Sequence, residues 1–490
     1  MSNPSESYLS LQTSSNLASI PDSGRIHIIG VCGVAMGALA LSLAERGYEV
    51  TGSDKEFYPP MSNLLEHSSV KLFTGYSADN IPSEVELVII GNSVPRTNVE
   101  VQQVEMRRLP HTFFAKFAGE YLLNDKTSIV VTGTHGKTTT TSLIAFGFEA
   151  LGQDPSYFIG GDVAQLPSSL KAGKGRIGVI EGDEYDSVFY VKRPKFLFYR
   201  PDVLIMNALE FDHADIYSSI EDIVREFAEL LTRVPDDGFV IACVDYPAIV
   251  ELIKQFPKER LITFGRNELA DYRLQGCSPS KDGCEISVVS PVGHFTIETE
   301  LFGEMNALNV LASTLAAKVC DVPISEWAVA IKSFRGVTRR LQKHVDTDTC
   351  VVLEDFAHHP TAVREVISAL RMKYPNARHW IAFEPRSNTS RRAIFQSEYG
   401  ECFEGVDRVF LRDIATRHSD TGQELMNVDT LMSDISSHGA VCEVFENGGD
   451  IASRVQELVQ GDGGDPQIAI TVMSNGSFDG LIEKLKNIFQ

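Results

Sequence analysis

Short apolar runs that end in glycine or in acidic residues recur through most of the chain and alternate with stretches of helical length. Runs of this kind, rich in Val and Ile and bounded by turn residues, predict strands buried in a parallel sheet. The predicted strands cover residues 25–30, 49–52, 87–91, 129–132, 177–180, 203–206, 351–353, 380–383, 409–411 and 468–473. Residues 285–301 change to a short β alternation, and residues 306–319 follow as a predicted helix. The pattern therefore predicts an α/β protein.

One of these strands leads into the most informative segment of the chain. Residues 129–141 read Ile-Val-Val-Thr-Gly-Thr-His-Gly-Lys-Thr-Thr-Thr-Thr. The Lys-Thr-Thr opens a predicted apolar helix from about Lys137 to Leu151. Gly133 and Gly136 allow backbone N–H groups to face an anion. Lys137 can reach the terminal phosphates of a nucleotide, and the Thr138 hydroxyl can bind magnesium. The segment predicts a site for a nucleoside triphosphate, although it is shorter than the usual consensus; a glycine turn without a ligand is the alternative.

A glycine-rich turn near the N-terminus is a second candidate for phosphate binding. Its glycines are Gly30, Gly33 and Gly37, a spacing that does not match the Gly-x-Gly-x-x-Gly of dinucleotide-binding folds. Asp54 ends the next strand, where an acid that binds ribose would lie. The turn predicts either a nucleotide site or a parallel-sheet turn with no ligand.

The length of the chain predicts about three domains, since 490 residues are too many for a single core. The predicted divisions are a disordered tail over residues 1–24, a first domain over 25–125, a central domain over 126–343 and a third domain over 344–490. The expected folds are Rossmann-like for the first domain, a P-loop ATPase for the central domain and a Rossmann-like α/β fold for the third. The tail is rich in Ser, Asn and Pro and lacks the basic start and apolar core of a signal peptide.

Charge, cysteine content and hydropathy narrow the possible functions. The formal net charge of −22 argues against nonspecific binding of nucleic acid. The eight cysteines include no Cys-x-x-Cys pair, so neither a disulfide framework nor a zinc site is favoured. No run approaches the roughly 18 apolar residues needed to cross a bilayer. These features predict a cytoplasmic protein that binds neither nucleic acid nor membrane.

Acidic residues gather after a strand of the central domain. Glu181, Asp183, Glu184 and Asp186 follow the strand at 177–180. Mg²⁺ prefers a few carboxylates together with phosphate oxygens and water. Glu181 lies nearest the strand end and is the expected magnesium ligand; a solvated acidic loop is the alternative.

A histidine with acidic neighbours follows the next strand of the same domain. His213 stands between Glu210, Asp212 and Asp215. An imidazole at a strand end can bind a metal or transfer protons, and a surface histidine is the alternative interpretation.

Two motifs of the third domain also follow strands. His358 and His359 precede Pro360, which favours a helix start. Paired histidines beside carboxylates recur in catalytic sites, and a pair that caps the helix is the alternative. Residues 384–392, Glu-Pro-Arg-Ser-Asn-Thr-Ser-Arg-Arg, offer three guanidinium groups suited to carboxylates; a solvated basic loop remains open.

The order of these motifs resembles that of the Mur ligases, the ATP-dependent amide-forming enzymes of peptidoglycan synthesis. The resemblance covers nearly the whole chain after the tail. It is carried by Gly-Val-Cys-Gly at 30–33, Gly-Thr-His-Gly-Lys-Thr-Thr at 133–139, Asn-Ala-Leu-Asn at 306–309, Arg-Arg at 339–340 and His-His-Pro-Thr at 358–361. Further motifs, at 58–62, 181–186, 209–215 and 383–389, resemble most the branch that joins UDP-N-acetylmuramate to the recycled tripeptide L-alanyl-γ-D-glutamyl-meso-diaminopimelate.

The resemblance implies a role for each domain and a reaction. The first domain would hold the UDP sugar, the central domain would bind ATP, and a mobile third domain would bring the amino substrate. ATP would phosphorylate the lactyl carboxylate of the muramate, and the tripeptide amine would attack the acyl phosphate to give an amide, ADP and phosphate. The implied cofactors are ATP and two Mg²⁺ ions, and the implied partners are the two substrates.

The same resemblance implies the site residues. The expected catalytic residues are Lys137, Glu181, His213 and His358, with Thr138 and Glu181 on one magnesium and His213 on a second. The expected ATP-binding residues are Gly133, Thr134, His135, Gly136, Lys137, Thr138, Thr139, Asn306, Asn309, Arg340 and Asp355. The expected UDP-sugar residues are Gly30, Gly33, Gly37, Ser53, Asp54, Asn92 and Ser93. The expected residues for the amino substrate are His359, Arg386, Ser387, Asn388 and Thr389.

Two features depart from the family pattern. Many relatives carry a carbamylated lysine a short distance past the metal histidine, but residues 226–229 here read Glu-Phe-Ala-Glu. The branch that adds L-alanine lacks this lysine too, so its absence favours that side of the family and leaves the ligands of the second metal open. The usual His-Asn before the adenine helix is Met305-Asn306, which leaves one contact to adenine open.

Two other functions compete with this interpretation. A UDP-N-acetylmuramate:L-alanine ligase has the same fold and donor with a smaller acceptor. A regulatory nucleotide-binding ATPase would hydrolyse ATP without ligation. Polymer-extending relatives such as folylpolyglutamate synthetase fit less well, because they lack this kind of UDP-binding first domain.

Overall fold

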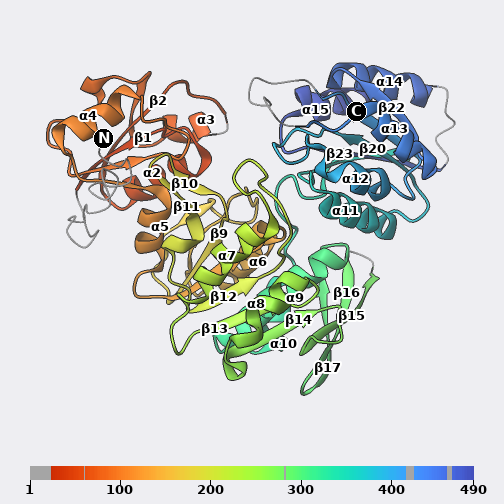
Figure 1. The fold of residues 1–490 in the computed structure, drawn as a ribbon, viewed down its shortest axis with the longest axis horizontal. Helices are drawn as coiled ribbons and strands as arrows, with labels where there is room; N and C mark the ends of the chain where they lie inside the picture. The colour runs from red at the N-terminus through yellow and green to blue at the C-terminus, as the bar shows by residue number, and fades with distance from the viewer. Residues whose placement is uncertain (1–23, 60, 281–282, 415–423, 461–465, 490) are drawn as a thin grey trace. The chain divides into compact units, whose positions relative to one another are not determined.

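The computed structural model describes residues 24–59, 61–280, 283–414, 424–460 and 466–489 (Figure 1). The predicted tail over residues 1–24 lies outside this part of the chain, except for Gly24. The described chain forms two compact units. The first unit holds the chain up to Leu209, Glu221–Phe264 and Ala312–Ile331, and the second holds Glu210–Ile220, Gly265–Leu311 and the chain from Lys332.

The first unit begins with a sheet of five parallel strands in the order β3-β2-β1-β4-β5. The strands are β1 (Arg25–Ile29), β2 (Glu49–Asp54), β3 (Lys71–Thr74), β4 (Leu87–Ile90) and β5 (His111–Phe113). The connecting helices are α2 (Val34–Glu45), α3 (Met61–Glu66) and α4 (Val99–Arg107), and α5 (Phe114–Leu123) follows. The strand order reverses at β1, and open α/β sheets bind ligands beyond the carboxyl ends of strands at such a point.

The first unit also holds seven neighbouring strands of a larger sheet, in the order β14-β13-β12-β6-β9-β7-β8; among these seven, only β8 is antiparallel to its neighbour. The strands are β6 (Thr127–Thr132), β7 (Ser156–Phe158), β8 (Leu170–Lys171), β9 (Ile177–Gly182), β12 (Val203–Met206), β13 (Phe239–Cys243) and β14 (Leu261–Gly265). Its helices are α6 (Lys137–Ala150), α7 (Ile220–Leu231), α8 (Pro247–Leu252) and α10 (Ile324–Ile331). A hairpin of β10 (Asp186–Val188) and β11 (Val191–Pro194) and a 3₁₀ turn, η4 (Lys195–Phe198), follow β9. Because β6 lies between β9 and β12, the loops after these three strands meet at one edge of the sheet.

The second unit opens with an antiparallel meander. Its strands are β15 (Tyr272–Pro279), β16 (Cys284–Ser290) and β17 (Gly293–Thr299), and the helix α9 (Glu304–Val319) follows. The predicted β alternation over 285–301 is confirmed as β16 and β17. β15 was not predicted from the sequence, because its exposed end mixes polar residues with glycine and proline.

The second unit also contains a doubly wound sheet in the order β18-β19-β23-β20-β21-β22. The strands are β18 (Gln342–Asp346), β19 (Cys350–Asp355), β20 (Arg378–Phe383), β21 (Arg408–Arg412), β22 (Val441–Phe445) and β23 (Ile468–Met473). The helices are α11 (Pro360–Lys373), α12 (Gln396–Cys402), α13 (Val428–Ser437), α14 (Gly448–Gln460) and α15 (Leu481–Phe489). Alternate strand residues pack with α11, α12 and α13 in one core and with α14 and α15 in another. Figure 1 labels these helices around the sheet. Because these strands are buried on both faces, their sequences are continuous apolar runs.

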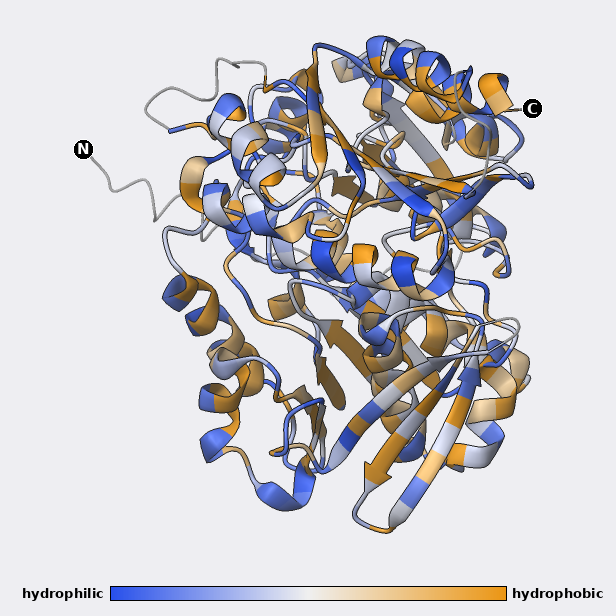
Figure 2. Cartoon of the chain, turned by 90° about the vertical axis from the view of Figure 1, so that its right-hand side faces the viewer, coloured by the Kyte–Doolittle hydropathy of each residue, from blue (hydrophilic) through white to orange (hydrophobic). Residues whose placement is uncertain are grey.

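The three-part α/β fold class is confirmed. Several strands are orange in Figure 2, whereas the long strands at the lower right mix orange, white and blue. The predicted strands over 203–206 and 468–473 have the same bounds as β12 and β23. The strands β7, β8 and β10 were missed, because a run of two or three residues carries no detectable period. The strand β11 was missed because its Val-Lys-Arg-Pro has charged residues at its centre. No helix in the described part of the chain is long and apolar enough to cross a membrane.

Candidate functional site

The loop between β6 and α6 is shaped by two glycines with positive φ. Gly133 has a φ of 132°, and a Cβ built on it would lie 2.7 Å from the Ala208 nitrogen. Gly136 has a φ of 80° and precedes α6 with no side-chain cap. The Thr134 N–H donates to the Ala208 carbonyl at 3.0 Å and fixes the loop against the end of β12. The first N–H groups of α6 are thus directed at the space where an anion would bind.

Lys137 begins α6 and lies against both the loop and the acidic cluster. Its Nζ donates to the Gly133 carbonyl at 2.7 Å and to the two Glu184 carboxylate oxygens at 3.0 and 2.8 Å. Burial lowers the pKa of Lys137, but the negative charges of Glu184 and Asp183 outweigh burial and raise it above its usual value. The lysine therefore carries its charge at the position where phosphate oxygens would enter the loop.

Three carboxylates of the predicted acidic cluster are buried. Glu181, Asp183 and Glu184 are 3%, 7% and 1% exposed, so the solvated-loop alternative does not hold for them. Asp183 pairs with Lys195 at 3.1 Å, and Glu184 pairs with Lys137. Two lysines thus face three buried carboxylates, and a buried excess of negative charge is costly unless a cation balances it.

Glu181, on β9, is the carboxylate of this cluster that contacts the first turn of α6. One of its oxygens accepts the Gly160 N–H at 2.6 Å, and the other accepts the Thr138 hydroxyl at 3.1 Å. Burial and the charge of Asp183 raise the pKa of Glu181 to about 7. Thr138 and Glu181 are hard oxygen donors at the end of a phosphate loop, so the residues fit a magnesium ion.

Two polar residues of this site were missed by sequence reasoning. Lys195 is 8% exposed and also lies over the Tyr185 ring at 4.2 Å. Asn207 directly follows β12 and donates to the Thr140 hydroxyl at 2.9 Å, which joins β12 to α6. Two sequence signals could have identified them. Lys195 lies within the apolar Lys-Phe-Leu-Phe of η4, and Asn207 follows a buried strand.

The predicted UDP-sugar residues are distributed around the switch point of the first sheet. Gly30 has a φ of 83°, and its N–H donates to the Ser53 carbonyl at 2.8 Å. One carboxylate oxygen of Asp54 accepts the Cys32 N–H at 2.8 Å and so holds the glycine turn. Gly33 precedes α2, and a Cβ on Gly37 would lie 2.3 Å from the Met61 sulfur. The conformation of the turn thus accounts for Gly30, its close packing accounts for Gly37, and its hydrogen bond to Cys32 accounts for Asp54.

The remaining members of that set differ in exposure. Asn92 and Ser93 are exposed directly after β4. Ser53 is fully buried, and its hydroxyl donates to the Glu100 carboxylate. The side chain of Ser53 thus belongs to the interior of the sheet, while Asn92 and Ser93 face solvent at its edge.

Glu100 is a buried acid that sequence reasoning did not single out. Besides Ser53, its carboxylate accepts the Asn80 amide at 2.7 Å and the Ser77 N–H at 3.0 Å, and it lies 3.4 Å from His27 Nε2. Burial raises the pKa of Glu100, but these hydrogen bonds outweigh burial and hold the pKa below its usual 4.5. A charged network inside the first sheet therefore supports the strands that carry the glycine turn.

Replacing Glu100 with glutamine is expected to destabilise the first sheet by about 1–3 kcal/mol at pH 7 and by less at pH 3. A carboxylate with a lowered pKa stabilises the fold above the unfolded pKa, and this contribution is lost as the pH falls through the folded pKa. Hydrogen exchange of peptides from β1 and β2 measures the difference. Glu105→Gln on the same helix is the matched control, and an equal effect of Glu100→Gln at both pH values would contradict the prediction.

His213 lies in a strained turn of the second unit. Its φ is 52°, an uncommon conformation for a residue other than glycine. The His213 backbone N–H donates to the Asp212 carboxylate at 2.7 Å, and this hydrogen bond holds the turn in place. The Ala214 N–H donates to the Thr389 hydroxyl at 3.2 Å, and the Asn388 amide donates to Asp215 at 3.1 Å. The structure therefore brings together the His213 motif and the 384–392 motif, which are far apart in the sequence.

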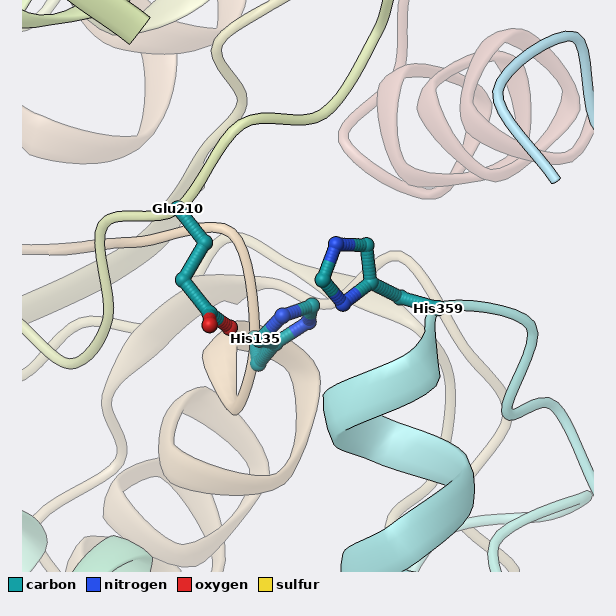
Figure 3. A group of neighbouring side chains, drawn as sticks. All are labelled: His135, Glu210 and His359. Atoms are coloured by element: carbon teal, nitrogen blue, oxygen red, sulfur yellow. The ribbon is translucent and has the colours of Figure 1, made fainter. Parts of the chain in front are cut away.

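The two histidines before α11 have different surroundings. His359 caps α11 by accepting the Thr361 N–H at 3.4 Å, and the Thr361 hydroxyl donates to Glu210 at 3.0 Å; His359 and Glu210 are labelled in Figure 3. His358 Nδ1 lies 3.0 Å from the Phe356 carbonyl, which requires a proton on that nitrogen. The capping alternative thus holds for His359 and not for His358.

Arg340 and Asp355, the predicted nucleotide contacts, lie close to each other. Arg340 lies over the Phe356 ring at 5.1 Å, and Asp355 accepts the N–H groups of Leu341 at 2.8 Å and Ala357 at 2.7 Å. Burial raises the pKa of Asp355, and the charge of Arg340 opposes this effect. Asn306 lies in the first turn of α9, and its amide donates to the Phe302 carbonyl at 2.9 Å. The Asn309 amide nitrogen lies 3.4 Å from the Asn306 amide oxygen.

Residues 384–392 contribute to a pocket of about 200 Å³ at the carboxyl end of the third sheet. Arg386, Arg391 and Arg412 line it together with the carboxylates Glu384, Asp413 and Asp479 and with Pro385, Ser477 and Phe478. Arg391 is 2% exposed, and Arg412 pairs with Asp479 at 3.0 Å. Arg412 and the segment around Asp479 carried no motif in the sequence, and only the fold places them beside Arg386.

The phosphate loop beside buried carboxylates, the parallel first sheet with its glycine-rich turn and the doubly wound third sheet define a nucleotide-binding protein of three α/β parts. Family models for three Mur ligase regions match the chain: the family's catalytic domain over residues 25–125, the middle domain over 131–317 and the glutamate ligase domain over 339–468.

Similar proteins carry ligase names. The chain is 34% identical over 467 residues to the UDP-N-acetylmuramate–L-alanyl-γ-D-glutamyl-meso-2,6-diaminoheptandioate ligase of Escherichia coli, covering 94% of this chain and 97% of that one. It is 30% identical to a UDP-N-acetylmuramate–L-alanine ligase of Caldanaerobacter subterraneus, with 87% and 88% covered. The crystal structure of a murein peptide ligase from Psychrobacter arcticus is 28% identical, with a TM-score of 0.67 over 95% of this chain and 99% of that one. The chain belongs to the Mur ligase family.

Proposed function

We propose that the protein joins UDP-N-acetylmuramate to L-alanyl-γ-D-glutamyl-meso-diaminopimelate in peptidoglycan recycling. Each α/β part would bind one reactant. Residues 25–125 would hold the UDP sugar, residues 126–343 would bind ATP, and residues 344–490 would bind the tripeptide. The chain is similar over nearly its full length to a ligase whose name carries both substrates. The proposed site of the reaction is the cytoplasm.

The reaction proceeds by activation of a carboxylate. A carboxylate is a poor acyl donor until one of its oxygens is phosphorylated. Because ATP and the carboxylate are both anionic, cations must neutralise charge for the two to meet. Lys137, held by Glu184 and the Gly133 carbonyl, would neutralise the transferring phosphoryl group. The loop N–H groups would hold the phosphates, and the tripeptide amine would then attack the acyl phosphate to form the amide.

Two magnesium ions are part of the proposal. Bound Mg²⁺ would neutralise charge on the phosphate oxygens. Thr138 and Glu181 would hold one ion, and the half-buried His213 would hold the second. Asn306 and Asn309 would contact adenine, Arg340 and Asp355 would contact the nucleotide, and His358 would lie near the reacting carboxylate.

The pocket that Arg386 lines is the observation that carries the choice of acceptor. Diaminopimelate ends in both an ammonium and a carboxylate. Guanidinium groups bind carboxylates in a fork, and carboxylates bind ammonium. Arg386, Arg391 and Arg412 stand beside Glu384, Asp413 and Asp479, a mixed set that suits a zwitterionic end more than a small neutral one. His359, Ser387, Asn388 and Thr389 complete the proposed acceptor region.

An acceptor panel tests the proposed function. Purified protein with UDP-N-acetylmuramate, ATP and Mg²⁺ is expected to release phosphate with the tripeptide and not with free L-alanine. Release with L-alanine alone would identify the competing L-alanine ligase. ATP hydrolysis that no acceptor stimulates would identify a regulatory ATPase.

Replacing Arg386 with alanine is expected to raise the KM for the tripeptide by about 10- to 100-fold, because a hydrogen bond to a charged group contributes about 1.5–3 kcal/mol. A Cβ on Gly476 would lie 1.4 Å from an Arg386 nitrogen, so Gly476→Ala should displace the same guanidinium and act alike. Steady-state phosphate release gives the KM. Arg454→Ala on α14 is the control, and an unchanged KM in Arg386→Ala would remove Arg386 from the acceptor site.

A further inference from the structure

Three sulfur atoms meet in the second unit, and none of the three residues that carry them is assigned to the ligation reaction. They belong to Cys277 on β15, Cys284 on β16 and Met372 near the end of α11. The Cys284 sulfur lies 3.5 Å from the Met372 sulfur, and the Cys277 and Cys284 thiols are hydrogen-bonded to each other. Cys284 therefore contacts both of the other sulfur atoms.

Strand register produces the cysteine pair. Cys277 lies opposite Ile286 in the antiparallel β15–β16 ladder. Cys284 is two residues from Ile286 along β16, so its side chain is on the same face of the sheet. Diagonal neighbours of this kind are within reach of each other's side chains. Cys284 is fully buried and Cys277 is half-buried, so the pair is enclosed on one side and accessible on the other.

The surroundings favour negative charge on Cys284. The hydrogen bond with Cys277 and the charge of Lys373 lower the pKa of Cys284, whereas the same hydrogen bond and burial raise the pKa of Cys277. The Gly303 N–H donates to both thiols. Gly303 has a φ of 92°, and a Cβ on it would lie 2.6 Å from the Ala369 Cβ, so this amide is held in place by close packing. The Lys373 ammonium interacts electrostatically with Cys284 and lies over the Phe302 ring at 4.7 Å.

We propose that Cys277, Cys284 and Met372 form a binding site for one soft monovalent metal ion of the copper(I) class. Thiolate and thioether ligands select such ions. Each cysteine would release its proton on binding, and two thiolates around a monovalent ion leave one negative charge. Lys373 and the Gly303 amide lie where that charge would be.

Other metals fit this donor set less well. A structural zinc site takes four nitrogen or sulfur ligands. Within the described part of the chain, no further His, Cys, Asp or Glu joins the two cysteines in a cluster whose ligand atoms lie within 4.8 Å of one another. A thioether also has little affinity for hard cations. Copper(I) accepts three sulfur ligands, which is the number present.

The test titrates the full, reduced chain with silver(I) as a redox-inert probe and with copper(I) against a competing chelator, both without oxygen. One tight equivalent is expected. Cys277→Ala and Cys284→Ser should each weaken binding by about 100-fold, and Met372→Leu by about 10-fold. Cys442→Ser and Met426→Leu are matched controls that should bind as the wild type does.

Thermal unfolding of each variant separates a lost ligand from a lost fold. X-ray absorption of the loaded protein should report sulfur ligands only. Equal binding by the wild type and a Cys277→Ala/Cys284→Ser double variant would overturn the proposal. So would a Met372→Leu protein with wild-type affinity, or a chain that takes up no metal and instead loses two hydrogen masses as a disulfide on treatment with peroxide.

Discussion

Replacing Lys137 with alanine is expected to lower kcat for ligation by at least about 10³-fold while the protein remains folded. Lys137 is the cation that both Glu184 oxygens and the Gly133 carbonyl hold at the start of α6. Without it, the negative charge that develops on the transferring phosphoryl group has no neutralising partner. Phosphate release in the presence of both substrates measures the loss.

Two further variants make the Lys137 result specific. Lys137→Ala leaves Glu184 buried without its partner, so Lys137→Ala/Glu184→Gln removes that unpaired charge and should recover stability without recovering turnover. Lys192→Ala removes an exposed lysine that pairs with Asp186 in the same region and should keep full activity. Near-normal turnover in Lys137→Ala would refute the assignment of the phosphate loop.

Replacing Glu181 with alanine is expected to raise the Mg²⁺ concentration for half-maximal activity by about 100-fold. Glu181 is the buried carboxylate that contacts Thr138 at 3.1 Å, and the pair offers the hard oxygens that Mg²⁺ prefers. A Mg²⁺ titration of phosphate release, at saturating ATP and substrates, measures the shift.

Asp186→Asn is the matched control for Glu181→Ala. Asp186 belongs to the same acidic motif, but it is half-buried and pairs with Lys192 at 2.8 Å, so its loss should leave the Mg²⁺ titration unchanged. If Glu181→Ala also titrates like the wild type, the ligand role would pass to Glu184.

The elements that carry the nucleotide site were predictable because their signals are local. A β-branched run predicts a buried strand, and glycine predicts a turn with positive φ. The Gly-Lys-Thr sequence predicts the start of a helix that has no side-chain cap. The end of β6, the start of α6 and the carboxylates after β9 therefore follow from residues that are neighbours in the sequence. The short strands β7 and β8 do not, because two or three residues carry no period.

The partners of those residues were not predictable, because their contacts are made across the fold. Lys195 balances Asp183, Glu100 collects hydrogen bonds from three different segments, and Thr389 binds the turn of His213. These partners lie between 12 and 175 residues apart in the sequence. No spacing rule identifies which lysine or threonine a distant carboxylate or turn will meet.

The sequence by itself determined the α/β class, the phosphate loop and the family resemblance, since these depend on residue type and order along a few turns of chain. The tertiary structure decided which polar groups are buried and what each one contacts. It separated His359, a helix cap, from His358, and it placed Arg412 and Asp479 beside Arg386. The physical reason is that burial and charge balance are properties of packed segments, and packing brings together residues that the linear order keeps apart.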